Sequence, residues 1–268
     1  YEKLCSFAHS KPYELSNTYK TTFGDSDQTC TLYHARFAEV FEALINAGVK
    51  VDAVVADPPY CSGGDVTTAR SKRLTKYFEY LRKKEGVKEF NDSMDQVSYA
   101  CFIASVFEGC LNILTPPGYV FIFSDWRQLP VNMITFQISG LTLRGVIPWN
   151  KKNSRPNPGI FRNQCEYIVW GTKSGASDKH GMGYIEKTMK PIHDRLHLTE
   201  KPVEVIEHCL KILPDNARTV FDPFMGSGST GEACARLGLS FVGSDQEEEF
   251  VKVAENRLRP LFKKEKKE

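Results

Sequence analysis

The chain has 268 residues, of which 41% are hydrophobic, a composition that is typical of a folded protein and excludes a wholly disordered one. Its 35 Lys and Arg residues nearly balance its 33 Asp and Glu residues and leave a formal net charge of +2. This balance excludes binding to nucleic acid through overall charge, so any such binding must come from local basic patches.

The first part of the chain predicts one βαβ unit. Residues 1–28 have little periodicity and are expected to form an irregular lead-in. From there the apolar pattern indicates a short strand at 29–35, an amphipathic helix at 37–48 that ends at a glycine, and a buried parallel strand at 51–56.

The four residues after this buried strand are Asp57, Pro58, Pro59 and Tyr60. Neither proline can continue a sheet ladder, because each lacks the N–H donor and has a fixed φ. The strand therefore ends here, and Asp57 and Tyr60 are expected at its carboxyl edge. Because ligands bind at that edge in open α/β sheets, the D-P-P-Y sequence predicts a functional site.

The middle of the chain continues to alternate between helices and strands. After a long polar segment, the expected elements are a helix at 97–114 stopped by two prolines and a glycine, a strand at 119–124, a helix at 126–139, and strands at 141–149 and 165–171. Residues 172–196 lose this periodicity and indicate an excursion from the core.

The last third of the chain regains a regular pattern. We expect a helix at 201–213 with Pro202 in its first turn, a strand ending at Asp222, a glycine-rich turn, and then a helix, a strand and a final helix up to residue 258. Strands that alternate with helices predict an α/β fold with a mostly parallel, doubly wound sheet covered on both faces.

The eight cysteines are scattered along the chain and form no C-x-x-C pair. This spacing favours reduced, structural thiols in a cytoplasmic protein over a disulfide or zinc framework, and no metal site is predicted. No apolar run approaches the roughly 18 residues of a membrane span, and there is no signal-peptide pattern, so no membrane association is expected.

The glycine-rich turn matches the G-x-G-x-x-G fingerprint of dinucleotide sites through Gly226, Gly228 and Gly231, with Asp245 at the end of the next strand. Asp222 argues against a dinucleotide, because its carboxylate would repel a pyrophosphate but suits an ammonium group. Too few residues follow the turn to form the usual second mononucleotide half there, so that half would have to be the earlier part of the chain. A cationic adenosine ligand such as S-adenosylmethionine fits better, with Asp245 accepting the ribose hydroxyls.

With both motifs considered, the chain resembles the DNA amino-methyltransferases, which methylate adenine at its 6-amino group or cytosine at its 4-amino group. In the β group of that family the D-P-P-Y half comes first and the F-x-G-x-G half last, as here, where the second motif is Phe224, Gly226 and Gly228. The sequence HLTEKP at 197–202 is similar to the family's H-x-T-x-K-P stretch. The resemblance covers residues 29–258.

The resemblance implies a Rossmann-like, circularly permuted methyltransferase fold in a single domain. It implies a catalytic half at 29–150, a target-recognition segment at about 150–196 and a cofactor half at 197–258. The implied cofactor-binding residues are Asp222, Phe224, Gly226, Ser227, Gly228, Asp245, Thr199, Lys201 and Pro202. The family often has Gly-Asp where this chain has Ala35 and Arg36, so the carboxylate that holds the adenine of the cofactor is expected elsewhere.

The chemistry explains why D-P-P-Y suits this reaction. An exocyclic amino group is a poor nucleophile because its lone pair is delocalised into the ring. Asp57 and the Pro58 carbonyl, each accepting one N–H, would localise the lone pair and stabilise the charge that develops during attack. Tyr60 would stack on the base, which must be flipped out of the duplex, and Pro59 would keep the acceptors rigid.

Some of these residues have simpler interpretations. The TEKP sequence can be an ordinary helix start with Thr199 as its N-cap. Basic stretches at 69–84, 150–163 and 173–195 are the expected DNA contacts, through phosphates and base edges, but charged residues of this kind can also just solvate a surface. The resemblance implies double-stranded DNA as substrate and leaves open a homodimer and a restriction endonuclease as partners.

The resemblance implies adenine rather than cytosine as the target base, because Asp rather than Ser precedes P-P-Y. The sequence thus predicts a site-specific, adenine-specific DNA methyltransferase of the β group, and it leaves open whether the protein belongs to a restriction-modification system or acts alone. Methylation of cytosine at its 4-amino group, methylation of RNA or protein, a nicotinamide-dependent oxidoreductase and a non-catalytic nucleic-acid-binding module remain as alternatives.

Overall fold

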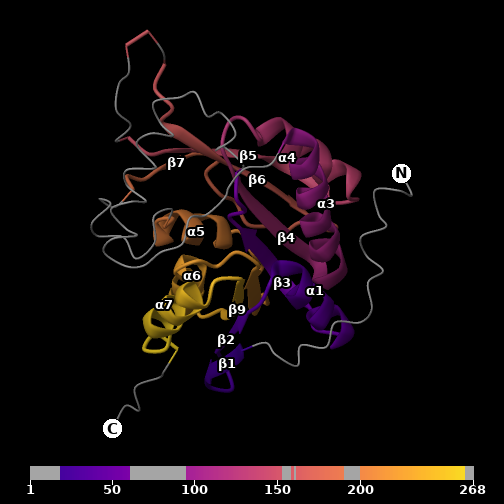
Figure 1. Cartoon of the computed structure of the whole chain (residues 1–268), viewed down its shortest axis with the longest axis vertical. Helices are drawn as coiled ribbons and strands as arrows, with labels where there is room; N and C mark the ends of the chain where they lie inside the picture. Colours follow the sequence, from indigo (N-terminus) through magenta and orange to yellow (C-terminus); the bar gives the residue numbers. More distant parts are fainter. Residues whose placement is uncertain (1–18, 61–94, 153–157, 160, 190–199, 263–268) are drawn as a thin grey trace.

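The computed structural model describes residues 19–60, 95–152, 158–159, 161–189 and 200–262 (Figure 1). Nine strands in this part of the chain form one sheet in the order β1-β2-β9-β8-β3-β4-β6-β5-β7. The strands are β1 (Tyr19–Gly24), β2 (Thr29–His34), β3 (Val51–Ala56), β4 (Leu114–Ser124), β5 (Thr142–Asn150), β6 (Cys165–Thr172), β7 (Ile185–Glu186), β8 (Thr219–Asp222) and β9 (Ser240–Asp245).

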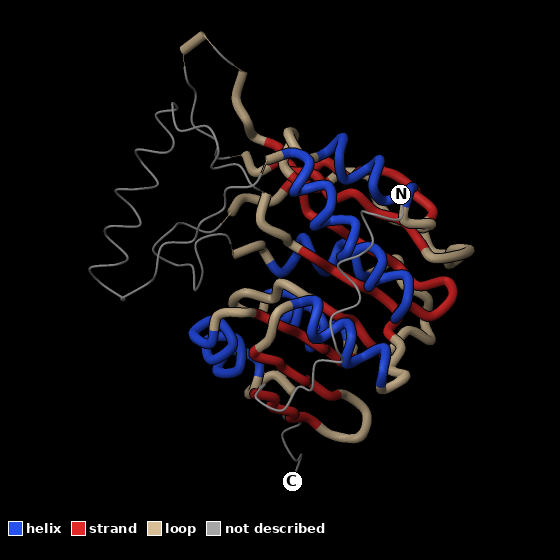
Figure 2. The backbone as a smooth tube through the Cα atoms, turned by 45° about the vertical axis from the view of Figure 1, so that its right-hand side comes forward, coloured by secondary structure: helices blue, strands red, loops and turns tan. Residues whose placement is uncertain are grey.

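Helices cover both faces of this sheet, as the tube in Figure 2 shows. The helices are α1 (Phe37–Asn46), α3 (Gln96–Ile113), α4 (Leu129–Ile138), α5 (Val203–Leu210), α6 (Ser229–Leu237) and α7 (Glu248–Leu258). None of the helices in the described ranges is long and apolar enough to cross a membrane.

The centre of the sheet is parallel. Strands β2, β9, β8, β3 and β4 run in the same direction, whereas β1 is antiparallel to β2, and β6 is antiparallel to both β4 and β5. The sequence prediction of a mostly parallel, doubly wound α/β fold is therefore confirmed. The carboxyl ends of the five central strands meet at one edge, which is where the two predicted motifs belong.

Two apolar cores lie on opposite faces of the sheet. One contains Ile206 of α5, Cys234 of α6 and Val251 of α7, and the other contains residues of α1, α3 and α4. Strand β4 contributes alternately to both cores, with Phe121 facing the first and Val120 the second. Burial on both faces explains why the central strands appear in the sequence as continuous apolar runs.

Three element predictions were wrong. Residues 19–24, expected in an irregular lead-in, form strand β1, because pairing with β2 supplies a ladder that the local sequence does not indicate. Strand β4 begins at Leu114 rather than 119, and its prolines lie where the register with β3 shifts, so no ladder donor is needed from them. The short strand β7 lies inside the segment expected to leave the core.

Candidate active site

The two predicted motifs lie side by side because their strands are neighbours. Strand β3 leads into Asp57 and strand β8 ends at Asp222, and the two strands pair in parallel through Val54 and Phe221. Strand β9, which ends at Asp245, pairs with the other side of β8. Three carboxylates that are distant in sequence therefore share the carboxyl edge of the sheet.

Both oxygens of the Asp57 carboxylate accept hydrogen bonds. The Tyr60 hydroxyl donates to Oδ1 at 2.7 Å, and the Lys201 ammonium donates to Oδ2 at 2.5 Å. Burial raises the pKa of Asp57, and the positive charge of Lys201 offsets only part of that effect. Burial and the Asp57 charge raise the pKa of Tyr60 well above its usual value, so the phenol remains a donor.

Lys201 lies against D-P-P-Y, although the sequence placed it with the cofactor residues. Its side chain is 7% exposed, and its ammonium lies 5.3 Å from the Tyr60 ring centroid and 5.4 Å from that of Phe123. Burial alone would lower the pKa of Lys201, but the attraction of Asp57 and Glu166 outweighs it and raises that pKa. Lys201 therefore stays charged.

A second ion pair extends this cluster onto strands β5 and β6. Lys151, which follows β5, donates to Glu166 Oε1 at 2.9 Å, and Glu166 Oε2 lies 3.7 Å from the Lys201 ammonium. Burial of Glu166 raises its pKa, but Lys201 and Lys151 outweigh this effect and hold the pKa below its usual range. Two lysines and two carboxylates thus balance in charge.

The segment after β4 supports D-P-P-Y from the other side. Gln128 is buried and donates from Nε2 to the Tyr60 carbonyl at 3.0 Å. The backbone N–H groups of Arg127 and Gln128 both donate to Asp125 Oδ1, which shapes the turn that carries the glutamine. Pro58 is buried and Pro59 half-buried, so the motif is held within the fold.

The glycine-rich turn is built around two carboxylates. Asp222 accepts from the Phe224 N–H at 2.9 Å and from the Thr230 hydroxyl at 2.5 Å, while Asp245 accepts from the Gly226 N–H at 3.0 Å. Gly226 has a φ of 50° and Gly228 a φ of 83°, values in the left-handed region that favours glycine.

The third glycine of the fingerprint has a packing role. A Cβ on Gly231 would lie 2.5 Å from Leu258 Cδ1 and 2.9 Å from the Phe241 ring, so a larger residue would require these buried side chains to shift. Phe224, predicted to bind the cofactor, packs its half-buried ring against Phe37 and Phe102, with ring centroids 5.4 and 5.9 Å apart.

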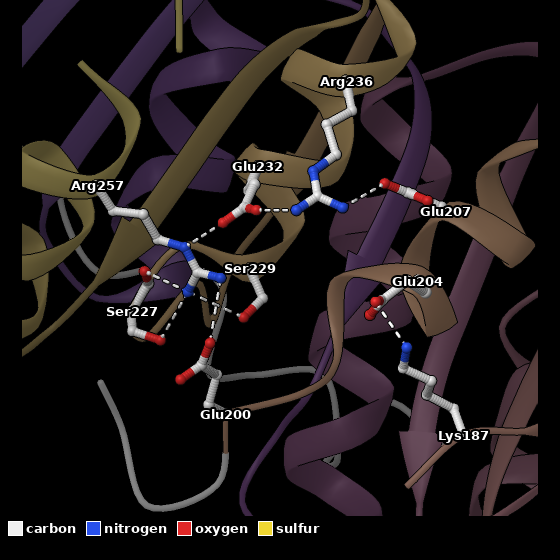
Figure 3. A network of polar contacts seen from close by, with 9 residues as sticks. All are labelled: Lys187, Glu200, Glu204, Glu207, Ser227, Ser229, Glu232, Arg236 and Arg257. Carbon is white, nitrogen blue, oxygen red and sulfur yellow. Dashed lines mark hydrogen bonds and ion pairs between the residues drawn. The ribbon is translucent and has the colours of Figure 1, made fainter. Parts of the chain in front are cut away.

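Arg257 of α7 connects the glycine-rich turn to the segment before α5 (Figure 3). Its guanidinium pairs with Glu232 at 2.7 Å and with Glu200 at 3.1 Å. The same group donates to the Ser227 carbonyl at 3.2 Å and the Ser229 hydroxyl at 3.3 Å. Since Glu200 precedes Lys201, one buried arginine helps to place both the predicted cofactor turn and the lysine bound to Asp57.

The carboxylates of the turn fit a cationic ligand. Burial raises the pKa of Asp222 to about 7 and that of Asp245 to about 6, because it outweighs the stabilising effect of the hydrogen bonds that each carboxylate accepts. A bound ammonium or sulfonium group near Asp222 would stabilise its ionised form, whereas Asp245 is suited to accept hydrogen bonds from ribose hydroxyls. The two carboxylates, together with glycines at 226 and 228 that let a ligand come close to the backbone, therefore fit S-adenosylmethionine.

This arrangement predicts that cofactor affinity depends on pH. If the cofactor cation binds the ionised form of Asp222, its affinity should rise about tenfold per pH unit below about pH 7 and then level off. Calorimetric titration with S-adenosylmethionine from pH 5.5 to 8.5 measures this. Asp222→Asn should flatten the profile, and equal pH dependence in the two proteins would contradict the assignment.

The same raised pKa values predict that the stability of the unliganded protein decreases as pH rises, whereas cofactor affinity increases. The folded state favours the protonated carboxyl, so this contribution to stability is fully present below the unfolded pKa of 3.8 and is lost as pH rises through about 6 to 7. Thermal unfolding without cofactor should therefore show a melting temperature that decreases as pH rises toward about 7. The decrease should be smaller in Asp222→Asn.

Other predicted residues are distributed as follows. Thr199 and His197 lie outside the described residues, whereas Pro202 is the N-cap of α5 rather than part of its first turn. At the position of the family's Gly-Asp pair, Ala35 is buried and Arg36 is the N-cap of α1, where its backbone N–H donates to Glu39. No carboxylate occurs at that pair of residues.

The predicted DNA contacts are only partly described. The stretch 69–84 lies outside the described residues, and the other two are described in part. There, several lysines already pair with acids of the same chain, as Lys152 does with Glu186 and Lys187 with Glu204. Phe161 and Arg162, in the loop between β5 and β6, are exposed. Within the described residues, no group of three or more His, Cys, Asp or Glu side chains is arranged to hold a metal ion.

Sequence reasoning missed the roles of Glu166, Lys151 and Arg257. Glu166 had a signal, because it is an acid inside an otherwise apolar strand, but the local sequence does not indicate that Lys151 and Lys201 are its partners. Arg257 had none, since a basic residue near the end of an amphipathic helix is ordinarily exposed.

A family model described as DNA methylase matches residues 51–256. The chain is 26% identical over 238 residues to the Type II methyltransferase M2.DpnII of Streptococcus pneumoniae, across 78% of this chain and 82% of that protein. It is 24% identical over 261 residues to the Type II methyltransferase M2.LlaDCHI of Lactococcus lactis subsp. cremoris, across 86% and 90%. The crystal structure of the M1.HpyAVI–SAM complex shares the fold, with a TM-score of 0.62 and 23% identity over 85% of this chain and 98% of that one.

Proposed function

The chain belongs to the N6/N4 DNA methylase family and therefore methylates DNA, and we propose that its target is the 6-amino group of adenine within a specific DNA sequence. The observation that carries the proposal is the position of Asp57 beside the glycine-rich turn, on neighbouring parallel strands. Adenine is favoured because Asp opens P-P-Y.

S-adenosylmethionine is the cofactor, and it supplies a methyl group already activated on a sulfonium. The residues proposed to hold it are Asp222, Phe224, Gly226, Ser227, Gly228 and Asp245. Pro202, the N-cap of α5, and Thr199, which lies outside the described residues, complete the proposed set. Asp245 would accept the ribose hydroxyls, and Asp222 would lie near the amino-acid part. Lys201 is better assigned to Asp57, given its 2.5 Å contact with that carboxylate.

D-P-P-Y would act on the amino group of the flipped base. Asp57 would accept one N–H and the Pro58 carbonyl the other, which localises the lone pair and stabilises the developing positive charge. The pKa of Asp57 is raised by burial, so the carboxylate form that can accept a hydrogen bond is lost at low pH. Tyr60 would stack on the base while its hydroxyl orients the Asp57 carboxylate.

DNA would approach the carboxyl edge of the sheet. The loop between β5 and β6 carries the exposed Phe161 and Arg162, an aromatic ring and a cation that suit contact with bases and phosphates. We propose that 29–150 is the catalytic half, about 150–196 recognises the target, and 197–258 binds the cofactor, all in one domain. We also propose that the protein acts in the cytoplasm, forms a homodimer and has a restriction endonuclease as its partner.

The decisive experiment is transfer of labelled methyl from S-adenosylmethionine to unmethylated genomic DNA, followed by nucleoside digestion and mass spectrometry. Methylated adenine is expected, and sequencing of the product gives the recognition site. Cytosine methylated at its 4-amino group would keep the mechanism and overturn the base assignment. Cofactor binding without label in DNA would direct the search to RNA or protein substrates.

A further inference from the structure

Lys201 lies between two carboxylates but forms a hydrogen bond with only one of them. Its ammonium donates to Asp57 Oδ2 at 2.5 Å, whereas Glu166 Oε2 is 3.7 Å away. The longer distance lies within ion-pair range but exceeds that of a hydrogen bond. The side chains of Lys201 and Glu166 are 7% and 15% exposed, so water screens these charges poorly.

Glu166 has one satisfied oxygen and one unsatisfied oxygen. Oε1 accepts from Lys151 at 2.9 Å, while the buried Oε2 accepts no hydrogen bond from the residues that the structure describes. An unpaired buried acceptor costs about 1–3 kcal/mol, so such groups are rare unless they have a use. A donor that reaches Oε2 in another state of the site would remove this cost.

Asp57 is in the opposite situation, since both of its oxygens are engaged. Tyr60 occupies Oδ1 and Lys201 occupies Oδ2. A base amino group needs one of these oxygens as its acceptor, and an ammonium already bound there competes for the lone pairs and withdraws charge. Asp57 in this arrangement is a weaker acceptor for the base than the reaction requires.

We propose that Lys201 moves its hydrogen bond from Asp57 to Glu166 Oε2 when the target base enters, and that Glu166 is a positioning residue for methyl transfer. A displacement of about 1 Å brings the Lys201 nitrogen within normal hydrogen-bond distance of Glu166. No proton changes residue and no covalent bond forms or breaks. The positive charge stays between the same two carboxylates, and Asp57 Oδ2 becomes available to the base.

Lys151 makes this exchange specific by holding the receiving carboxylate through its other oxygen. Without that contact, Glu166 could follow Lys201 toward Asp57 and would not draw it away. This inference rests on the proposed function, because it requires an amino group that enters the site and competes for Asp57.

Glu166→Gln tests the exchange with little change in shape. Its neutral amide attracts the ammonium less strongly, so the single-turnover rate of methyl transfer should fall about 10- to 100-fold. The Kd for S-adenosylmethionine, measured by calorimetry, should change less than about twofold because Glu166 does not act on the cofactor. Glu248→Gln, which changes an exposed glutamate on α7, is the control and should keep the wild-type rate.

A double-mutant cycle with Lys201→Met separates this role from a merely structural one. If Glu166 acts through Lys201, Glu166→Gln should have no further effect on the rate in the Lys201→Met background. The inference would be overturned if Glu166→Gln had the wild-type rate. It would also be overturned if Glu166→Gln lowered the rate of methyl transfer by the same factor in the wild-type and Lys201→Met backgrounds. If Glu166→Gln fails to fold by near-UV circular dichroism, Glu166→Asp replaces it with the same expectations, because its shorter side chain cannot reach both lysines.

The outcomes also separate this inference from the function on which it rests. Absence of methyl transfer by the wild-type protein would overturn both. Normal transfer by the wild-type protein and by Glu166→Gln would overturn the inference alone.

Discussion

Replacing Asp57 with alanine is expected to lower the rate of methyl transfer by about 10³-fold while cofactor binding is retained. The carboxylate is the proposed acceptor for the base amino group, and loss of one preorganised group of this kind costs about 10²–10³-fold in other enzymes. The effect should lie at the upper end, because Asp57 also orients Tyr60 through the 2.7 Å hydrogen bond. Single-turnover transfer to DNA measures the rate, and calorimetry measures cofactor binding.

The fold should tolerate this substitution. Lys201 would lose its 2.5 Å partner, but Glu166 Oε2 lies 3.7 Å from the same ammonium and can receive it. Asp215→Asn is a suitable control, since the Asp215 side chain is 95% exposed and distant from D-P-P-Y in the sequence. A wild-type rate in Asp57→Ala would remove Asp57 from the mechanism, and loss of cofactor binding would place it in the cofactor site instead.

Replacing Arg257 with methionine is expected to destabilise the protein by about 3–5 kcal/mol, the usual cost of breaking a buried ion pair. Glu200 and Glu232 would each lose the guanidinium, and the Ser227 carbonyl would lose a donor (Figure 3). For a chain of this size the melting temperature should fall by roughly 10 °C or more. Thermal and urea unfolding without cofactor measure the change.

The same substitution should weaken cofactor binding. The Arg257 guanidinium holds the Ser227 carbonyl and the Ser229 hydroxyl of the glycine-rich turn, so its loss should raise the Kd for S-adenosylmethionine about tenfold. Arg257→Lys keeps the charge but not the planar fork and should give an intermediate result.

Lys252→Met provides the matched control for Arg257, because it removes a cation from the same helix. Lys252 is 64% exposed and pairs with Glu248 one turn away, so its loss should change stability by less than about 0.5 kcal/mol. Equal stability of Arg257→Met and the wild-type protein would show that the buried cluster does not hold the turn.

The local sequence was sufficient to predict features that depend on the backbone of a few adjacent residues. The prolines of D-P-P-Y end a strand because they lack a donor, and Gly226 and Gly228 are needed where φ is positive, so both motifs were recognised and placed at strand ends. Strand β1 was missed because it is stabilised by pairing with β2 and has no clear apolar pattern of its own.

The sequence by itself therefore determined the class of fold, the two motifs and the kind of chemistry they serve. Only the tertiary structure decided that Lys201 binds Asp57, that Glu166 lies 3.7 Å from the same ammonium, and that Arg257 donates to the glycine-rich turn. These contacts join residues from different strands and loops, and they form only after the order β8-β3-β4-β6 brings those segments together. Charged side chains carry no signal of their distant partners, because their energy depends on burial and separation, which are properties of the folded chain.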